Sequence, residues 1–219
     1  LSLTVNYDTT ATDLANNILG VSGGINITNV TLTGSATSSG TFTDDTNSIG
    51  FPSGIVLSNG DAKLVEGPNK DTGATGINNL PGDPDLDKLI SGTTGVTTED
   101  ATVLTITFVP SYSGQATFKY VFGSEEYNEF VGEFNDVFGF FMNGKNIALL
   151  PDGVTPVSIN NLNDGNPLAQ WPATNSQYYV DNTDGHLATQ LDGLTTVLVA
   201  KGDVIAGQEN TIKLAIADA

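Results

Sequence analysis

The chain has 219 residues, 38% of them hydrophobic, no cysteine, and a formal net charge of −18 at pH 7. Its seven basic residues are all lysine. Nucleic acids and anionic membrane surfaces require a basic face, so this charge argues strongly against both as partners. The lack of cysteine excludes disulfides and thiolate metal sites, and the single histidine, His186, excludes a histidine-rich metal site. No segment approaches membrane-spanning length, so we expect no membrane insertion.

The first quarter of the chain predicts one helix and two strands. Residues 10–20 carry an apolar stripe that ends at a glycine, which indicates a helix capped by Thr12. Residues 25–33 alternate as a strand does, but the phase slips in the middle, which predicts a bulge. Residues 34–50 consist largely of Gly, Ser, Thr and Asp and are expected to form a polar connection before a short strand at 55–57.

The rest of the chain is predicted to be mostly short strands. Residues 83–92 are the exception, because Asp83 is followed by proline and an apolar stripe, as in a capped helix. Residues 99–110 alternate as a strand with Leu104, Ile106 and Phe108 on the inner side. Further strands are expected around the aromatic segments 117–122 and 137–142, and at 147–150, 154–159, 197–199 and 212–216.

This pattern predicts an all-β fold, a jelly-roll-like β-sandwich with two or three short helices in its connections. Residues 1–219 are expected to form a single ligand-binding domain, excised from a larger surface protein. The sequence ends within a strand pattern at Ala219, so we expect that further residues complete the fold.

An acidic segment lies between the two aromatic strands. Five carboxylates occur over twelve residues without a basic residue among them: Glu125, Glu126, Glu129, Glu133 and Asp136. A pair of like charges 4 Å apart costs about 4 kcal/mol near a protein surface. Such a cluster is therefore spread into solvent, partly protonated, or bound to a cation. Calcium is the best candidate, because it takes several oxygen ligands.

Carboxylates and amides at several strand ends are expected to converge on this cation. The predicted calcium ligands are Glu125, Glu126, Asn135, Asp136, Asp100 and Asp218. The predicted contacts to a bound molecule are Tyr127, Asn128, Trp171, Tyr178, Tyr179, Asp181 and Asp184. For Trp171, Tyr178 and Tyr179, packing in the core is an equally good interpretation.

Motifs of other functions are missing from the sequence. The Asp- and Asn-rich turns before Gly165 and Gly185 lack the ligand spacing and the closing glutamate of an EF-hand. No glycine-rich stretch has the spacing of a phosphate-binding loop. Glu126 with Asp136 would be the better acid–base pair of a hydrolase, since neighbours such as Glu125 and Glu126 point to opposite sides of a strand. His186 lies in an Asp/Gly turn and has no nucleophile elbow to serve, so the sequence favours a protein without catalytic activity.

The segment YVFGSEEYNEFVGEFNDVFGFFMNG, residues 120–144, resembles the signature of the choice-of-anchor L domain of bacterial surface and secreted proteins. The resemblance extends to GIVLSNG, EGPN, DATVLTITFVP, VSINNLN and the terminal LAIADA, and so covers most of the chain. It implies a β-sandwich displayed outside the bacterial cell. The chain is also similar to calcium-dependent peptide-binding modules of RTX-type adhesins.

Three hypotheses follow for a non-catalytic module. The first is a monomeric, calcium-dependent adhesin module, which binds a short peptide or the C-terminus of a protein on a host or partner cell. The second is a carbohydrate-binding module that stacks sugars on Trp171 and the neighbouring tyrosines. The third is a structural spacer that is stabilised by calcium and binds no ligand.

Overall fold

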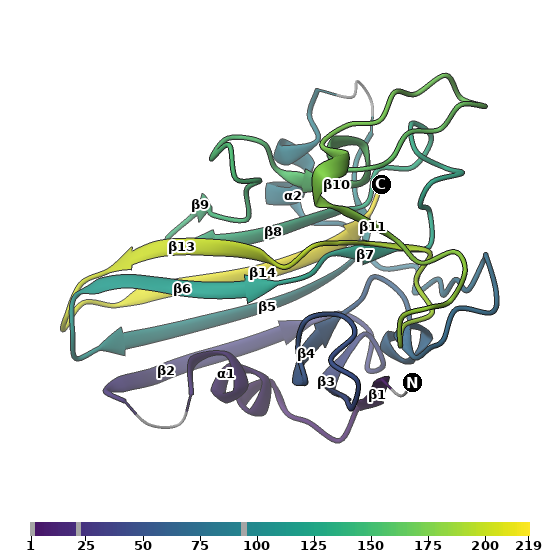
Figure 1. The fold of residues 1–219 in the computed structure, drawn as a ribbon. Coiled ribbons are helices and arrows are strands. Elements are labelled where there is room, and N and C mark those ends of the chain that lie inside the picture. The colour runs from purple at the N-terminus through teal and green to yellow at the C-terminus, as the bar shows by residue number, and fades with distance from the viewer. Residues whose placement is uncertain (1–2, 21–22, 93–95) are drawn as a thin grey trace.

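The computed structural model describes residues 3–20, 23–92 and 96–219 and shows a two-layered, all-β arrangement (Figure 1). The helices are α1 (Ala11–Leu19) and α2 (Pro84–Leu89), with short 3₁₀ turns at Ala62–Val65, Ile159–Asn161 and Ser176–Tyr178. The strands of the first half are β1 (Leu3–Asn6), β2 (Ile25–Thr33), β3 (Ser39–Asp44), β4 (Ser53–Leu57) and β5 (Glu99–Pro110). Those of the centre are β6 (Gly114–Tyr120), β7 (Gly123–Ser124), β8 (Val137–Met142), β9 (Lys145–Asn146) and β10 (Val157–Ser158). The last four are β11 (Tyr179–Asp181), β12 (Gly193–Thr195), β13 (Leu198–Val204) and β14 (Asn210–Asp218).

The first layer is one antiparallel sheet with the strand order β10-β8-β14-β5-β2, to which β9 is added beside β8. β5 fits the predicted alternation, because Leu104, Ile106 and Phe108 are buried and face the other layer. The bulge predicted in β2 is confirmed, since the pairing with β5 shifts between Ile27 and Asn29.

The second layer lies across the inner face of this sheet and consists of separate pieces. One piece is the sheet β1-β3-β4, another is the pair β13-β6, and a third is the small sheet β11-β12-β7. Aromatic contacts join the layers: the ring centroids of Phe118 and Phe140 are 4.8 Å apart, and those of Tyr120 and Phe138 are 5.1 Å apart. The sandwich predicted from the sequence is therefore confirmed, with a second layer that is divided between β4 and β6.

The two helices cover opposite parts of the first sheet. α1 packs Leu14 and Ala15 into the core between the layers. α2 lies on the outer face, where Leu86 contacts the cluster that contains Val137 and Phe141. β8 is therefore buried on both faces, and its apolar residues do not alternate with polar ones as those of a half-exposed strand do.

Four details differ from the expectations. Thr10, and not Thr12, caps α1, because its side chain accepts from the backbone N–H of Asp13 in a capping box. Residues 39–44, expected in a polar connection, form β3 between β1 and β4. The segment 147–150 makes only an isolated bridge instead of a strand. α2 begins after Asp83, as predicted, but ends at Leu89 and does not extend to the predicted end at residue 92.

Candidate functional site

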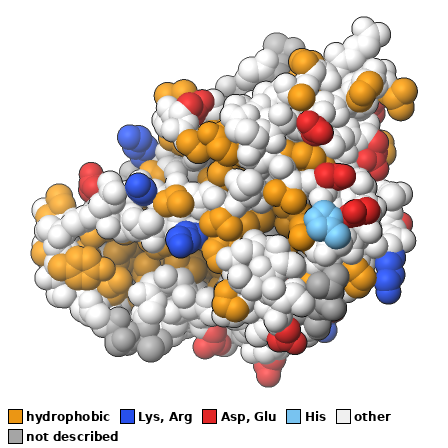
Figure 2. Space-filling model, in the orientation of Figure 1, with side chains coloured by type: hydrophobic (Ala, Val, Ile, Leu, Met, Phe, Trp, Pro, Cys, Tyr) orange, Lys and Arg blue, Asp and Glu red, His pale blue; other side chains and the backbone are white. Residues whose placement is uncertain are grey.

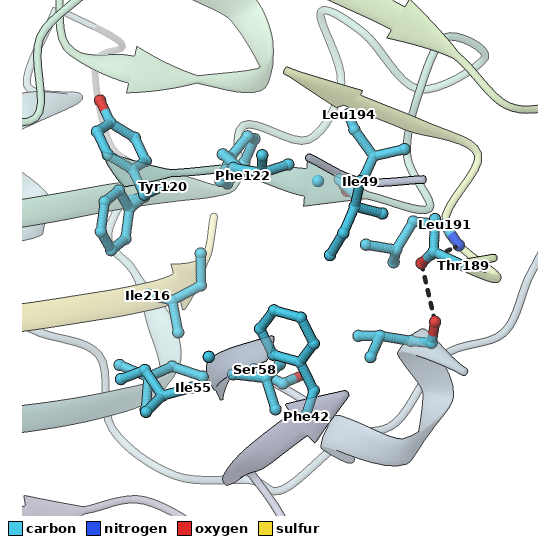
Figure 3. A pocket seen from close by; sticks show the side chains of 18 of the residues that line it. Phe42, Ile49, Ile55, Ser58, Tyr120, Phe122, Thr189, Leu191, Leu194 and Ile216 are labelled. Atoms are coloured by element: carbon cyan, nitrogen blue, oxygen red, sulfur yellow. Dashed lines mark hydrogen bonds between the residues drawn. The ribbon is translucent and has the colours of Figure 1, made fainter. Parts of the chain in front are cut away.

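A cavity of about 640 Å³ lies between the layers, at the division of the second layer. Strands β8 and β14 form its floor, and β4 and β6 form opposite walls. Figure 3 shows Tyr120 and Phe122 on one side of the cavity, Ile55 and Ser58 on the opposite side, and Ile216 of β14 between them. The apolar lining includes Ile55, Leu57, Phe118, Tyr120, Phe122, Phe138, Phe140, Leu214 and Ile216. The space-filling view, in the orientation of Figure 1, shows hydrophobic side chains across the middle of the molecule (Figure 2).

One end of this apolar cavity is acidic. Ser124, Glu125, Glu126, Asp136 and Asp218 line it there. Three of these residues, Glu126, Asp136 and Asp218, each place a carboxylate oxygen within 4.8 Å of the other two. They come from the loop after β7, the start of β8 and the end of β14. The pairing of β8 with β14, which places Val137 opposite Ala217, brings the last two together.

Asp136 is the buried member of this carboxylate cluster, with 5% of its surface exposed. The hydroxyl of Ser124 lies 3.4 Å from Asp136 Oδ2 and also donates to Glu126. Within the part of the chain that the structure describes, Asp136 Oδ1 is buried and has no hydrogen-bond partner. Burial raises the pKa of Asp136 well above its ordinary value, and the neighbouring carboxylates of Glu126 and Asp218 raise it further.

Glu125 belongs to a second acidic group beside the first. Its two carboxylate oxygens are buried without a hydrogen-bond partner among the described residues. Burial raises the pKa of Glu125 to about 8, the charge of Asp192 adds to this effect, and the nearby amide of Gln190 opposes it. Asp192 is fully buried, and its pKa is raised by burial, although Asn69 donates a hydrogen bond to it.

The two adjacent glutamates thus lie in different acidic groups, and Glu125, predicted to bind the same ion as Glu126, lies outside the carboxylate cluster. Asp192 was not among the predicted ligands. Its sequence context, Leu-Asp-Gly, is typical of an ordinary turn, and only long-range folding brings it to Glu125.

Besides Glu125, two more predicted ligands lie outside the carboxylate cluster and have other contacts. The carboxylate of Asp100 accepts hydrogen bonds from the backbone N–H groups of Asn78 (2.9 Å) and Leu80 (2.5 Å), and so holds the loop before α2. The amide oxygen of Asn135 accepts from the backbone N–H of Asn160 at 2.9 Å. Both side chains are buried, and their contacts are those of structural residues.

The residues predicted to contact a ligand do not form one surface. Tyr127 is fully buried, and its ring contacts Tyr179 at a centroid distance of 5.1 Å. Asn128 donates to the hydroxyl of Tyr179 at 3.0 Å. Trp171, Tyr178 and Tyr179 are partly buried and pack against the same hydrophobic cluster. Asp181 and Asp184 are exposed, with Asp181 bonded to Thr183 and Asp184 paired with His186.

The chain matches the family model of the choice-of-anchor L domain over residues 4–219. It belongs to the choice-of-anchor L domain family. The domain is a module of surface-anchored or secreted bacterial proteins, and the family is one of non-catalytic surface modules. No curated protein and no solved structure matches the chain. Among the described residues, no helix is long and apolar enough to cross a membrane.

Proposed function

We propose that this choice-of-anchor L domain is a calcium-dependent, non-catalytic binding module that acts outside the cell and captures a short peptide or protein terminus. The observation that supports the cation most directly is the cluster of Glu126, Asp136 and Asp218 at the acidic end of the cavity. At a separation of 4.8 Å, two ionised carboxylates repel each other by about 3.5 kcal/mol at an effective dielectric constant of 20. A bound dication removes this cost.

The chemistry of the donors favours calcium over other metal ions. The cluster offers only oxygen atoms, which suit hard cations, whereas zinc and copper prefer histidine and cysteine. Calcium takes six to eight oxygen ligands in flexible geometry. Three carboxylates leave some of these positions to water or to oxygen atoms of a bound molecule. The unpartnered Oδ1 of buried Asp136 fits a ligand of this kind, because a buried acceptor without a partner is costly.

The position of the cluster connects the cation with ligand capture. An apolar cavity that ends in a few polar groups is the usual form of a binding site. The cavity floor and the cluster share β8 and β14, so an ion that binds Asp136 and Asp218 also fixes the end of the floor. The carbohydrate hypothesis has less support, since Trp171 and the two neighbouring tyrosines pack against the core.

Calorimetric titration of calcium into chelator-treated protein tests the proposal. We expect saturable binding, which Glu126→Gln weakens at least tenfold, or by about 1.4 kcal/mol. Glu133→Gln is the matched control, because Glu133 is an exposed carboxylate of the same loop outside the cluster. Absence of calcium binding at millimolar concentration would refute the proposal, as would equal weakening by both variants.

A further inference from the structure

The division of the second layer leaves two strand edges on the same cavity. In the described part of the chain, β4 pairs with β3 alone and β6 pairs with β13 alone. Their other edges both line the cavity, and they lie on opposite sides of it in Figure 3. An unpaired edge presents a row of N–H and C=O groups that is ready to accept another strand.

The pairing of β4 shows which backbone groups face the cavity. The backbone N–H of Ser58 donates to the carbonyl of Ser38, directly before β3, and the carbonyl of Pro52 accepts from the N–H of Asp44 in β3. The even-numbered residues of β4 therefore form their backbone hydrogen bonds with β3. In an antiparallel pair the intervening residues direct their N–H and C=O groups to the opposite edge. These residues include Ile55 and Leu57, whose backbone groups therefore point across the cavity.

The two edges run in the same direction, toward the carboxylates. β6 leads into Ser124, which contacts Glu126 and Asp136. Ser58, directly after β4, accepts a hydrogen bond at its carbonyl from the hydroxyl of Thr102, and Thr102 pairs with Ile216 near the end of β14. β4 therefore also ends near the carboxylate cluster. A single strand between β4 and β6 can thus be antiparallel to both, in keeping with the antiparallel pairing of every named sheet pair.

We propose that the cavity is a slot for one extended peptide strand of a partner protein, inserted antiparallel between β4 and β6. This inference rests on the proposed function and defines the conformation and chemistry of the captured peptide. Alternate apolar side chains of the peptide contact the floor formed by residues such as Phe138 and Ile216. The antiparallel direction places the amino end of the peptide at the acidic end of the cavity.

Charge complementarity supports this occupant and this direction. Four carboxylates line the end of the slot where the amino end lies, namely Glu125, Glu126, Asp136 and Asp218. With a proton on Glu125 and one calcium ion bound, the three carboxylates of the cluster still retain a negative charge, which attracts an α-amino group or a lysine. An apolar small molecule would cover the floor but leave the backbone groups of Ile55 and Leu57 without partners. A strand satisfies them, as in other cases of strand addition.

A synthetic peptide tests the slot directly. The probe is KVTVTVT, with a free amino end, an amidated carboxyl end and apolar residues at every second position. We expect it to bind the chain in calcium, and expect at least about tenfold weaker binding of the rearranged peptide KVVVTTT, which lacks the alternation. Weaker binding of TVTVTVK, which moves the lysine to the other end, is expected from the direction of the strand. Equal binding of all three peptides, or binding of none, would overturn the inference.

Hydrogen exchange locates the bound peptide without any substitution. KVTVTVT is expected to slow amide exchange at Ile55 and Leu57, because their N–H groups gain partners. Ile55→Arg places a charge in the wall of the slot and is expected to abolish binding. Val199→Arg, at an exposed position of β13, makes the same charge change away from the slot and should leave binding intact. Protection elsewhere with unchanged exchange at Ile55 and Leu57 would contradict the inference.

Two further comparisons separate this inference from its premise. Calcium binding without peptide binding would overturn the slot and leave the cation site standing. Equal peptide binding in EDTA would support the slot and contradict calcium dependence.

If the domain is studied within a longer polypeptide, protection of Ile55 and Leu57 without added peptide would show that its own chain fills the slot, and would overturn the assignment to a partner.

Discussion

Replacement of Asp136 by asparagine tests how much of the stability of the protein comes from a cation bound to this carboxylate. Glu126, Asp136 and Asp218 all lie within 4.8 Å of one another, so three ionised groups would repel by about 10 kcal/mol in total at an effective dielectric constant of 20. This is comparable to the whole stability of a domain. Without a cation the protein therefore keeps a proton on Asp136, in agreement with the raised pKa of this group.

Asparagine has the shape of a protonated aspartate, so Asp136→Asn should change the free energy of unfolding in EDTA by no more than about 1 kcal/mol. In calcium the result is different. A ligand at about 1,000 times its Kd stabilises the folded state by about 4 kcal/mol. For a chain of this length that corresponds to a rise in Tm of roughly 8–16 °C. We expect the wild type to show this rise and Asp136→Asn to lose most of it, as measured by scanning calorimetry in EDTA and in calcium.

Asp100→Asn provides the matched control. Asp100 is as buried as Asp136, but its carboxylate accepts the N–H groups of Asn78 and Leu80. Its replacement should lower Tm by the same amount in EDTA and in calcium, and the calcium-induced rise should remain. A full calcium-induced rise in Asp136→Asn would refute the reasoning, because the buried carboxylate would then play no part in binding the ion.

Three other predictions concern pH and charge. In EDTA the free energy of unfolding should fall as pH rises from about 5 to 8, because folded Glu125, with a pKa of about 8, keeps a proton that the unfolded chain releases near 4.5. This pKa difference corresponds to at most about 5 kcal/mol of unfolding free energy, which partial solvent contact reduces to roughly 2 kcal/mol. Glu125→Gln should flatten the pH dependence, as measured by urea unfolding at pH 5 and 9. An unchanged pH dependence in this variant would contradict the prediction. Calcium affinity should increase over the same pH range, because the cation must displace protons from the carboxylates, and calorimetry at two pH values checks this. Lys213→Met should lower the free energy of unfolding in urea by roughly 2 kcal/mol, because Lys213 Nζ lies 2.7–2.8 Å from carboxylate oxygens of Asp83 and Asp85. An unchanged free energy of unfolding would show that these two ion pairs do not stabilise the fold.

The sequence predicts those parts of the fold in which the hydrophobic pattern and the local caps agree. β5 alternates over its whole length, and Asp83 with Pro84 marks the start of α2. β3 was missed because its sequence, Ser-Gly-Thr-Phe-Thr-Asp, contains a single large apolar residue and reads as a polar connection. Its pairing with β1 and β4, which are distant in the chain, decides its structure.

The candidate site, too, could be predicted from the sequence only where local patterns determine it. The proximity of Glu126 and Asp136 was predictable, since they lie near the two ends of the loop that joins β7 to β8. Asp218 joins them through the pairing of β14 with β8. Asp100 was included because it stands at a strand entrance, but a left-handed backbone conformation with φ of 49° and two loop N–H groups direct its carboxylate elsewhere. The cavity depends on the long-range arrangement that places β4 and β6 on opposite sides of it, and could not be predicted from local sequence patterns.

Diffraction from crystals grown with calcium, at a wavelength at which the ion scatters anomalously, tests the central claim most directly. We predict one anomalous peak between the carboxylates of Glu126, Asp136 and Asp218, with oxygen ligands at about 2.3–2.6 Å. A map without a peak there, in which Asp136 shares a proton with its neighbours and only water occupies the acidic end of the cavity, would contradict the account.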